Sequence, residues 1–523
     1  MNDIKKDMMQ IAHDTSDVGL VYLKGDNVWC ENAGDFTLPD YMPEIGKMLT
    51  CTPRLIPSGK YIGSDRAEFS GSVVYSLMYT GDDGLPFCTT LSGEYEYSVP
   101  LGEAADSARI EIYEEPVVES VSVRASGPRK ISVRTRIRAR PFIAYEKKIT
   151  RPDIPSEADN GYQRLTEGRK VSMHRHFESG EFSLSEEFKL DTSPDAEPVA
   201  CDGLIYVTDI VRSGASVICR GEVECSILYY DIEGGRRKLL GSNKKLRFEK
   251  EITMPETEAL TGVRAYGRVI STDMSVSEDS SVISVNATID ILGDYTTERD
   301  VELVRDIYSC KSGCSVKYES TEYFRGVMCR NLNVSCHAEK QLPESDREYD
   351  VCASFATPKV NSVNVFDGIA EFTGEILVDC LLSGVSGEGV EYTSVSVSVP
   401  FKCEAPTSAV TERYEISVLP ESAGVRTRIE KEKLSVDCEV YLSAMIEGAE
   451  GVSTVKSVCE TAPSVTRSNN GITVYYPDKG ETLWSVAKKY SVMLSATAEV
   501  NGLSADHPDS PSSLDGVECM LII

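Results

Sequence analysis

The residues that could do chemistry in this chain are few and scattered. Of five histidines, His13, His174, His176, His337 and His507, only His174 and His176 in "MHRHF" are close enough to share a ligand. A metal held by this pair would need acidic or thiol ligands at matching spacing, and the neighbouring sequence offers none. We therefore expect a solvated pair, in or beside a segment that connects two domains.

Cysteine offers a second possible chemistry. The chain has 16 cysteines, and the closest pair, Cys310 and Cys314 in "CKSGC", lacks a second pair or a histidine at zinc-ligand spacing. Many others stand singly in apolar alternating segments, where a reduced thiol behaves as a small hydrophobic side chain. The pattern predicts buried free thiols and no metal site; the clearest cases are Cys219, Cys225, Cys380 and Cys438.

The sequence motifs that usually mark an enzyme are missing. The chain has no glycine-rich phosphate loop ending in Lys-Ser/Thr, no HExxH and no nucleophile elbow. Abundant carboxylates leave a glycosidase-like acid/base pair open, because folding could bring two of them together. We expect a protein that is not an enzyme, with no catalytic residue and no cofactor.

The composition is that of several soluble globular domains. A chain of 523 residues has room for about three to five domains, and 41% hydrophobic with 26% charged residues is ordinary for such domains. The formal net charge of −29 disfavours binding to nucleic acid and to anionic membrane surfaces. No apolar run has the length of a secretory signal or a membrane span, so we expect a cytosolic protein with no integral membrane segment.

Three segments of the chain share one layout. Each has a glycine, then about eight residues that alternate between two faces, then a turn rich in glycine and acidic residues. Since Gly71, Gly221 and Gly374 recur about every 150 residues, the layout predicts three tandem domains of one kind. The segments are "FSGSVVYSLMYTGDDG" (69–84), "CRGEVECSILYYDIEGG" (219–235) and "FTGEILVDCLLSGVSGEG" (372–389).

A second strictly alternating segment follows each glycine. These segments are "KISVRTRIRARPF" (130–142), "VISVNATIDILGD" (282–294) and "KLSVDCEVYLSAM" (433–445). A period of two over this length indicates a half-buried strand. The expected fold is mainly β: three tandem antiparallel β-sandwich-like domains that supply length, followed by a small βααβ domain.

Segments rich in proline, glycine and charge divide these units. We expect connections at 147–170 and 300–322, and a small polar stretch at 461–471 predicts a flexible tether that isolates the last domain. We place an N-terminal segment and four domains at residues 1–27, 28–148, 178–299, 323–460 and 472–523.

The last domain combines a strand, two helices and a final strand. Ile472, Val474 and Tyr476 alternate, and a helix follows the turn at 477–480, with Thr482 placed as its cap. Four apolar positions then fall on one helical face: Leu483, Val486, Ala487 and Tyr490. The register of the last strand stays open between two pairs facing inward, Cys519 with Leu521 or Met520 with Ile522.

This segment resembles a LysM domain. Residues 472–523 contain "VYYPDKGETLWSVAKKYSV" followed by "VNGL", and the positions that carry the resemblance are Gly480, Thr482, Leu483, Trp484, Tyr490, Asn501 and Leu503. The sequence departs from the family pattern at Glu481, which replaces an aspartate, at Met493, where a capping Ser or Thr is common, and at Thr497, where a core leucine is expected.

The first β-domain opens with the segment "FTLPDYMPEIGKMLT", which the second and third copies lack. Through Pro39, Asp40, Pro43, Glu44 and Ile45, this segment resembles the SPOCS domain of endospore coat proteins. SPOCS units followed by a LysM domain are similar to the spore coat morphogenetic proteins of the SipL and SpoVID type.

The LysM resemblance implies a shallow binding groove between the first turn and the loop before the last strand. LysM domains usually bind N-acetylglucosamine-containing glycans there, whereas the coat family implies a protein, the SpoIVA-like coat morphogenetic ATPase. We expect Trp484 and Tyr490 to be core residues rather than ligand platforms. The groove residues are Asp478, Lys479, Gly480, Glu481, Thr482, Leu483, Asn501, Gly502 and Leu503.

The resemblances together imply an assembly protein. We expect a scaffold of spore coat assembly, anchored through its LysM domain to the coat ATPase and binding other coat proteins, some of them along exposed strand edges. Its expected location is the mother-cell cytoplasm, at the forespore surface. The alternative is a protein that binds peptidoglycan in the cell wall or cortex.

Overall fold

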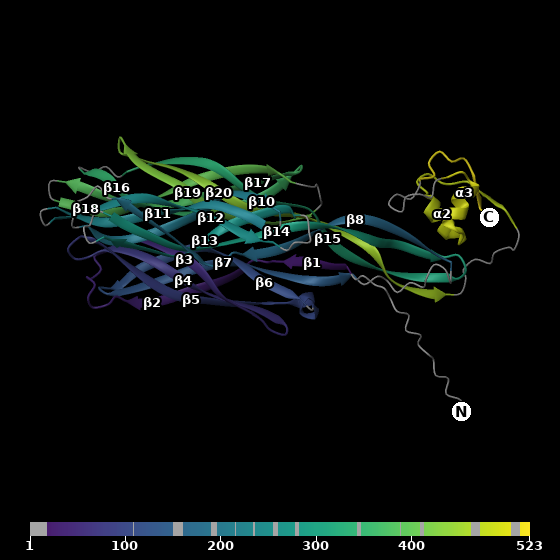
Figure 1. Cartoon of the computed structure of the whole chain (residues 1–523), viewed down its shortest axis with the longest axis horizontal. Helices are drawn as coiled ribbons and strands as arrows, with labels where there is room; N and C mark the ends of the chain where they lie inside the picture. The colour runs from purple at the N-terminus through teal and green to yellow at the C-terminus, as the bar shows by residue number, and fades with distance from the viewer. Residues whose placement is uncertain are drawn as a thin grey trace, which may run out of the picture.

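The computed structural model is mainly β, as predicted, with two short helices near the C-terminus (Figure 1). Three β-domains form a bundle, and a narrow extension leads from the bundle to the C-terminal domain. The structure describes residues 18–107, 109–149, 161–189, 196–214, 216–233, 236–254, 260–277, 282–342, 347–386, 389–407, 413–461, 471–503 and 513–522.

The first sheet of each β-domain has three antiparallel strands in sequence order. Its middle strand carries the repeated glycine, and an aromatic residue of the third strand lies opposite: Tyr95 opposite Gly71, Phe248 opposite Gly221 and Phe401 opposite Gly374. A Cβ at Gly374 would come within 2.4 Å of the Phe401 ring, so only glycine fits. The strands are β3 (Lys47–Ile62), β4 (Arg66–Thr80), β5 (Pro86–Pro100), β10 (Glu197–Ser213), β11 (Ser216–Glu233), β12 (Arg236–Thr253), β16 (Glu348–Phe366), β17 (Ile369–Ser386) and β18 (Gly389–Pro406).

The second sheet of each domain is built around the second alternating segment. β7 (Lys130–Ile149), β14 (Val282–Ser309) and β20 (Lys433–Thr461) each pair on one side with the preceding strand and on the other with the strand or strands that open the domain. The partners are β1 (Val18–Lys24), β2 (Val28–Thr37), β6 (Ile110–Gly127), β8 (Tyr162–Glu178), β9 (Phe182–Lys189), β13 (Leu260–Val276), β15 (Gly313–Gln341) and β19 (Arg413–Glu430); a 3₁₀ helix, η1 (Gly102–Asp106), precedes β6.

Irregularities in the strand pairing recur in all three domains. The first two strands of each first sheet shift register twice, and the second shift lies at Pro57/Gly59, Val207/Asp209 and Val360/Ser362. Such bulges add local twist at a defined point of a sheet. Their recurrence at matching places shows that the three domains repeat one fold.

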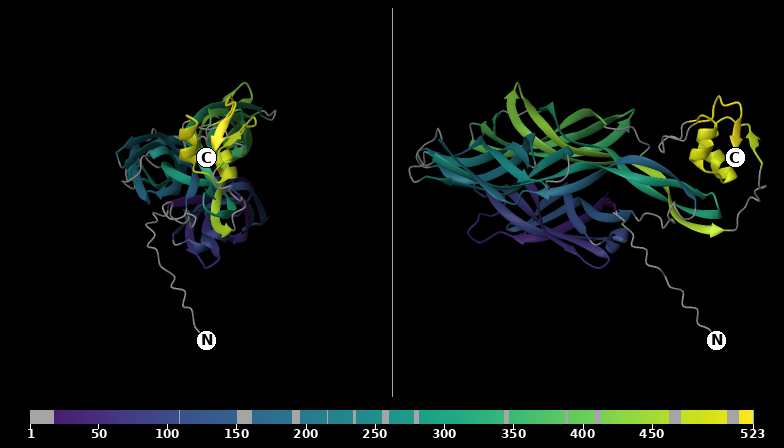
Figure 2. Two further views of the ribbon diagram at one scale, coloured as in Figure 1. Left: turned by 90° about the vertical axis from the view of Figure 1, so that its right-hand side faces the viewer. Right: turned by 45° about the vertical axis from the view of Figure 1, so that its right-hand side comes forward.

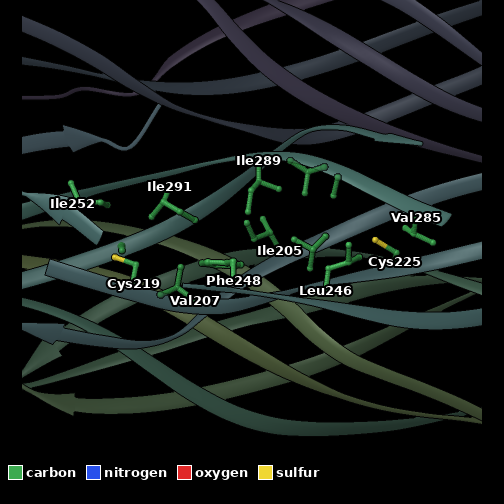
Figure 3. Packing of buried hydrophobic residues seen from close by; sticks show 14 of the residues in the cluster. Ile205, Val207, Cys219, Cys225, Leu246, Phe248, Ile252, Val285, Ile289 and Ile291 are labelled. Atoms are coloured by element: carbon green, nitrogen blue, oxygen red, sulfur yellow. The ribbon is translucent and has the colours of Figure 1, made fainter. Parts of the chain in front are cut away.

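The two sheets of each domain enclose an apolar core. In the second domain, Val207 of β10 and Cys219 of β11 pack with Ile289 of β14, and all three are fully buried (Figure 3). All sixteen cysteines are free, and the four singled out from the sequence are buried. The prediction of free thiols as core residues is therefore confirmed at these four positions.

The three domains lie side by side, whereas we expected three tandem domains that supply length. Seen along the long axis, they form three lobes (Figure 2, left). Met78 of the first domain, Leu228 of the second and Phe355 of the third belong to one buried cluster. Each domain therefore buries one of its faces against the other two, a contact that the sequence did not predict. The three repeats add to the width of the molecule and not to its length.

Strands of the second and third domains continue beyond the bundle as a stalk, formed by residues 162–171, 299–323 and 450–461. The expected connection at 300–322 is wrong, because the end of β14 and the start of β15 occupy it. The described part of the expected connection at 147–170 is likewise strand, at the end of β7 and the start of β8, and 150–160 lie outside the described residues. Alternating Val301 and Leu303 hold the stalk together by packing against Tyr323 and Val452.

Candidate functional site

The C-terminal domain has the predicted βααβ order. It consists of β21 (Thr473–Tyr475), α2 (Leu483–Tyr490), α3 (Leu494–Val500) and β22 (Met520–Ile522), and the two strands pair antiparallel. Met520 and Ile522 are buried whereas Cys519 and Leu521 are exposed. The register that the sequence left open is therefore the one with Met520 and Ile522 inward.

The two helices start differently. The Thr482 hydroxyl accepts the Ser485 backbone N–H and the Ser485 hydroxyl accepts that of Thr482, so α2 has a complete capping box, as Thr482 predicts. α3 has no side-chain cap, because its N-cap position is Met493, where the LysM pattern commonly has Ser or Thr. Thr497 is buried, and its hydroxyl donates to the Met493 carbonyl at 2.8 Å.

Several predicted groove residues hold the domain together. The Glu481 carboxylate accepts the Tyr475 hydroxyl at 2.8 Å and the Asp478 backbone N–H at 2.9 Å, which fixes the turn. Asn501 bonds both backbone groups of Leu521, so it ties the end of α3 to β22. Leu483 is buried in the core. Thr482 and Leu503 are half-buried, and the exposed positions are Asp478, Lys479, Gly480 and Gly502.

The turn side of the predicted groove is bonded to residues 514 and 515, just before β22, whereas Asn501 on the other predicted side bonds Leu521 of β22. The Gly480 backbone N–H donates to the Asp515 carboxylate at 3.1 Å, and the Leu514 N–H donates to the Glu481 carbonyl at 3.0 Å. The turn after β21 is therefore anchored to the segment before β22. Its outward surface is small and consists of one carboxylate, one ammonium and glycine backbone.

A larger exposed surface lies on the two-stranded sheet and was not singled out as a binding surface from the sequence. Val474 is 51% exposed and lies opposite Leu521, which is 37% exposed. Ile472 and Tyr476, on either side of β21, are 68% and 70% exposed. The alternation of this strand was visible in the sequence, but alternation alone does not tell which face is open. We call Ile472, Val474, Tyr476 and Leu521 the apolar face.

The other side of the domain is docked on the stalk. Trp484 of α2 is 5% exposed, and its indole N–H donates to Asp306 of β14 at 2.9 Å. The Lys488 ammonium lies 2.7 Å from both oxygens of the same carboxylate. Although burial opposes the effect, the hydrogen bonds from Lys488 and Trp484 lower the pKa of Asp306.

Further contacts surround this ion pair. The Tyr308 ring meets the Trp484 ring edge to face at 4.9 Å between centroids, and its hydroxyl donates to the Val492 carbonyl at 2.7 Å. The Leu494 backbone N–H donates to Gln163 of β8 at 3.3 Å.

The expectation of an isolated domain is therefore wrong. Trp484 is a core residue, as expected, but the core to which it belongs is shared with the stalk. Of the expected tether at 461–471, residues 462–470 lie outside the described residues.

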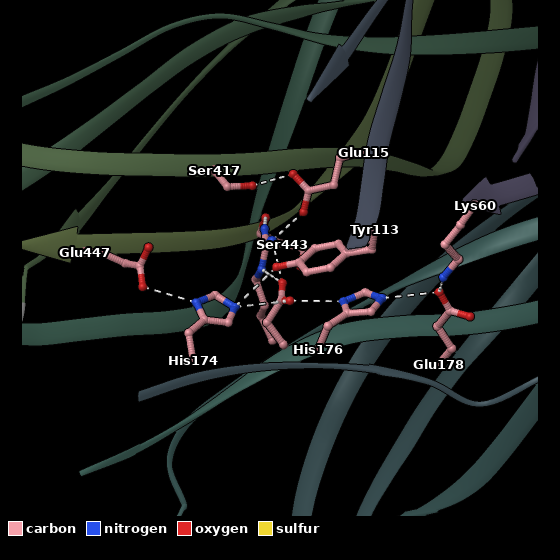
Figure 4. A network of polar contacts seen from close by, with 11 residues as sticks. Lys60, Tyr113, Glu115, His174, His176, Glu178, Ser417, Ser443 and Glu447 are labelled. Carbon is pink, nitrogen blue, oxygen red and sulfur yellow. Dashed lines mark hydrogen bonds and ion pairs between the residues drawn. The ribbon is translucent and has the colours of Figure 1, made fainter. Parts of the chain in front are cut away.

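The expectation of solvated histidines at 174 and 176 is also wrong. Both lie on β8, and His174 is 2% exposed, 3.2 Å from Asp294 and 3.1 Å from Glu447 (Figure 4). His176 lies 3.1 Å from Asp294 and 3.5 Å from Glu178. Burial opposes protonation, but the Glu447 and Asp294 carboxylates raise the pKa of His174 to about 9. Burial likewise opposes protonation of His176, and its contacts with Asp294 and Glu178 raise its pKa, so both histidines are structural residues and not solvated ones.

These histidines belong to a buried network that joins all three β-domains. Arg264 of β13 is 0% exposed and lies 2.6 Å from the Asp294 carboxylate. Arg264 also pairs with Glu115 of the first domain and donates to the Ser443 carbonyl of the third at 3.3 Å. Two arginine contacts thus cross domain boundaries, and removing this cation would leave buried carboxylates without their partner.

Two further kinds of site were sought in the part of the chain that the structure describes, a metal site and a membrane-spanning helix. Within it, no three His, Cys, Asp or Glu side chains are grouped so as to hold a metal ion. Among the same residues, no helix is both long and apolar enough to cross a membrane.

Comparison with known proteins identifies one part of the chain. Residues 478–510 match the LysM domain family. No match to a SPOCS domain or to the SipL and SpoVID type was found. No curated protein and no solved structure matches the chain. The protein therefore carries a C-terminal LysM domain on a mainly β body, and LysM domains bind peptidoglycan or proteins.

Proposed function

We propose that this protein is a non-enzymatic adaptor whose LysM domain binds another protein. The observation that carries the proposal is the apolar face, because four large apolar side chains on so small a domain lose contact with water only when a partner covers them. Apolar and aromatic residues are typical of the centre of protein interfaces. Tyr476, at 70% exposed, is the most accessible anchor of the four.

The mounting of the domain supports the same function. Because Trp484, Lys488, Val492 and Leu494 contact the stalk, the LysM domain is held at the end of the molecule with the apolar face open. A fixed orientation lowers the entropy lost when a partner binds. The lateral bundle behind the stalk offers further surfaces for other partners.

The proposed partner is the SpoIVA-like coat morphogenetic ATPase, with other coat proteins binding the β-domains. This choice rests on the resemblance of the segment around Pro39 and Glu44, and of the terminal LysM domain, to spore coat proteins. We propose the mother-cell cytoplasm, at the forespore surface, as the location. The net charge of −29 favours a partner with a basic surface, whose approach it would accelerate.

Peptidoglycan binding is the second candidate. The LysM match at 478–510 favours it, since N-acetylglucosamine-containing glycan is a common LysM ligand. The exposed backbone of Gly480 and Gly502 would let a sugar approach the groove closely. In that case the turn, rather than the apolar face, would carry binding.

One paired experiment separates the two candidates. The full chain is incubated with the purified coat ATPase and, separately, with sedimentable peptidoglycan, and the bound fraction is measured in each case. We expect saturable capture of the ATPase and no retention on peptidoglycan. Retention on peptidoglycan without capture of the ATPase would replace the proposal by the second candidate, and release of reducing sugar would show an enzyme.

A further inference from the structure

A cavity lies where the three β-domains meet. Its volume is about 300 Å³, and strands of all three domains line it: β3 and β6 of the first, β10, β13 and β14 of the second, and β16 and β19 of the third. This volume is at the small end of ligand pockets, which span about 300 to 1,000 Å³ and often lie at domain interfaces. Part of the wall consists of proline rings, from Pro53, Pro57, Pro116, Pro358 and Pro420.

Three polar groups on this wall are buried and have no hydrogen-bond partner in the protein. They are the Tyr266 hydroxyl, the Nε–H of Arg268 and the Ser422 hydroxyl. A buried polar group without a partner costs about 1 to 3 kcal/mol. Three such groups from two adjacent domains, on one cavity wall, point to an occupant with oxygen atoms that accept hydrogen bonds.

The charges of the wall limit what that occupant can be. Both arginines are already paired, Arg54 with Asp202 and Arg268 with Asp290. Glu421 is held by the backbone N–H groups of Gly267 and Val207 at 2.6 and 3.1 Å rather than by a cation. Burial raises the pKa of Glu421 to about 8, which reflects the cost of a negative charge there.

An anion is disfavoured here, because both arginines of the wall are already paired and burial already raises the pKa of the wall carboxyls Glu114 and Glu421. An ammonium group carries only donors, so it would leave the Arg268 Nε–H unmatched. A neutral molecule with several hydroxyl groups adds no charge and can still accept hydrogen bonds. Each hydroxyl can accept from Tyr266, Ser422 or Arg268 and donate to Glu421. The proline rings suit the C–H faces of such a molecule.

We propose that the cavity between the β-domains binds a small neutral polyol through Tyr266, Arg268 and Ser422. The ligand would contact two domains at once, so its binding would stabilise the bundle. This inference is independent of the function proposed for the LysM domain, because it rests on other residues.

The test uses the full chain and three probes, myo-inositol as neutral polyol, putrescine as cation and succinate as anion, with binding measured by isothermal titration calorimetry. We expect saturable binding of myo-inositol alone. Tyr266→Phe and Ser422→Ala should each weaken it about tenfold. Because these buried hydroxyls bond nothing in the protein, both variants should melt at or above the temperature of the unliganded wild type.

Tyr441→Phe is the matched control, because Tyr441 lies outside the cavity wall and this variant should bind like the wild type. Binding of putrescine or succinate in place of myo-inositol would overturn the proposal. The same holds if none of the probes binds, which indicates a cavity filled by water, or if Tyr266→Phe binds myo-inositol at wild-type strength.

Discussion

Trp484 and Asp306 are 178 positions apart in the chain, yet the indole N–H of one donates to the carboxylate of the other at 2.9 Å. This hydrogen bond joins the LysM domain to the stalk. With the Lys488 ion pair and the Tyr308 ring beside it, the contact decides how the LysM domain is oriented.

We predict that Asp306→Ala releases the LysM domain from the stalk. The substitution removes the acceptor of three donor side chains, Trp484, Lys488 and Tyr318, and leaves the buried Trp484 N–H without its partner. The chain has 2 tryptophans, so the readout is tryptophan fluorescence in a Trp29→Phe background. The emission of Trp484 should shift to the red as water reaches the ring.

Glu319→Ala is the control for this prediction, because Glu319 is a stalk carboxylate that pairs with Lys456 and not with the LysM domain. Its emission should match that of the background protein. An unshifted emission in Asp306→Ala would mean that the aromatic contacts hold the domain without the carboxylate.

We predict that Arg264→Met strongly destabilises the bundle. Removing the buried guanidinium leaves Glu115 and Asp294 without their shared cation, and loss of one partner from a buried ion pair costs about 3 to 5 kcal/mol. Urea denaturation followed by circular dichroism measures the loss. Arg428→Met, which removes an exposed arginine paired with Glu430, should change stability by less than about 1 kcal/mol; equal effects of the two variants would contradict the role of the network.

The stability of the bundle should depend on pH through His174. Its pKa is about 9 in the folded protein against 6.5 without the fold, so its contribution is complete below pH 6.5 and is lost as the pH rises through 9. We expect a loss of about 3 kcal/mol from this residue between those limits. Burial raises the pKa of the Glu421 carboxyl to about 8, so its ionisation also lowers the stability of the bundle as the pH rises.

A comparison with His174→Gln isolates the histidine. Urea midpoints are measured below pH 6.5 and above pH 9 for both proteins, since 6.5 and about 9 are the two pKa values of His174. The wild type should lose more stability than the variant as the pH rises. Parallel curves for the two proteins would contradict a protonated His174 in the folded state.

The repeated glycines should not tolerate a side chain. In Gly374→Ala the new methyl group would lie 2.4 Å from the Phe401 ring and 2.2 Å from the Lys359 carbonyl, so we expect a loss of about 1 to 3 kcal/mol or more. In the control Gly451→Ala the nearest neighbour of the methyl group is the Ser320 hydroxyl at 4.0 Å. Thermal unfolding of both variants measures the difference, and an unchanged Gly374→Ala protein would contradict the close packing.

Local features of the fold could be predicted from the sequence. The alternation in segments such as 282–294 predicted the central strands, because consecutive side chains of a half-buried strand point alternately to the core and to solvent. Thr482 was predictable as a cap, since the motif and its hydrogen bonds lie within three residues.

Features that depend on distant residues could not be predicted. The burial of His174 in an ion-pair network could not be predicted, because its partner Glu447 is 273 positions away. The stalk was misread as connections because its polar residues suggested a loop, whereas the alternating Val301 and Leu303 are buried by Val452 of another domain. The docking of Trp484 depends on Asp306, which no local pattern connects to it.

The central claim, that the apolar face of the LysM domain binds the coat ATPase, is tested most directly by one substitution in the full chain. Val474→Glu places a charge on the face at a position that is 51% exposed, so the fold should remain while an apolar partner is repelled. Val390→Glu is the matched control, because Val390 is 50% exposed and lies on a β-domain. We predict that Val474→Glu weakens capture of the ATPase about tenfold or more and that Val390→Glu captures it like the wild type. Capture by Val474→Glu at wild-type strength would contradict the claim.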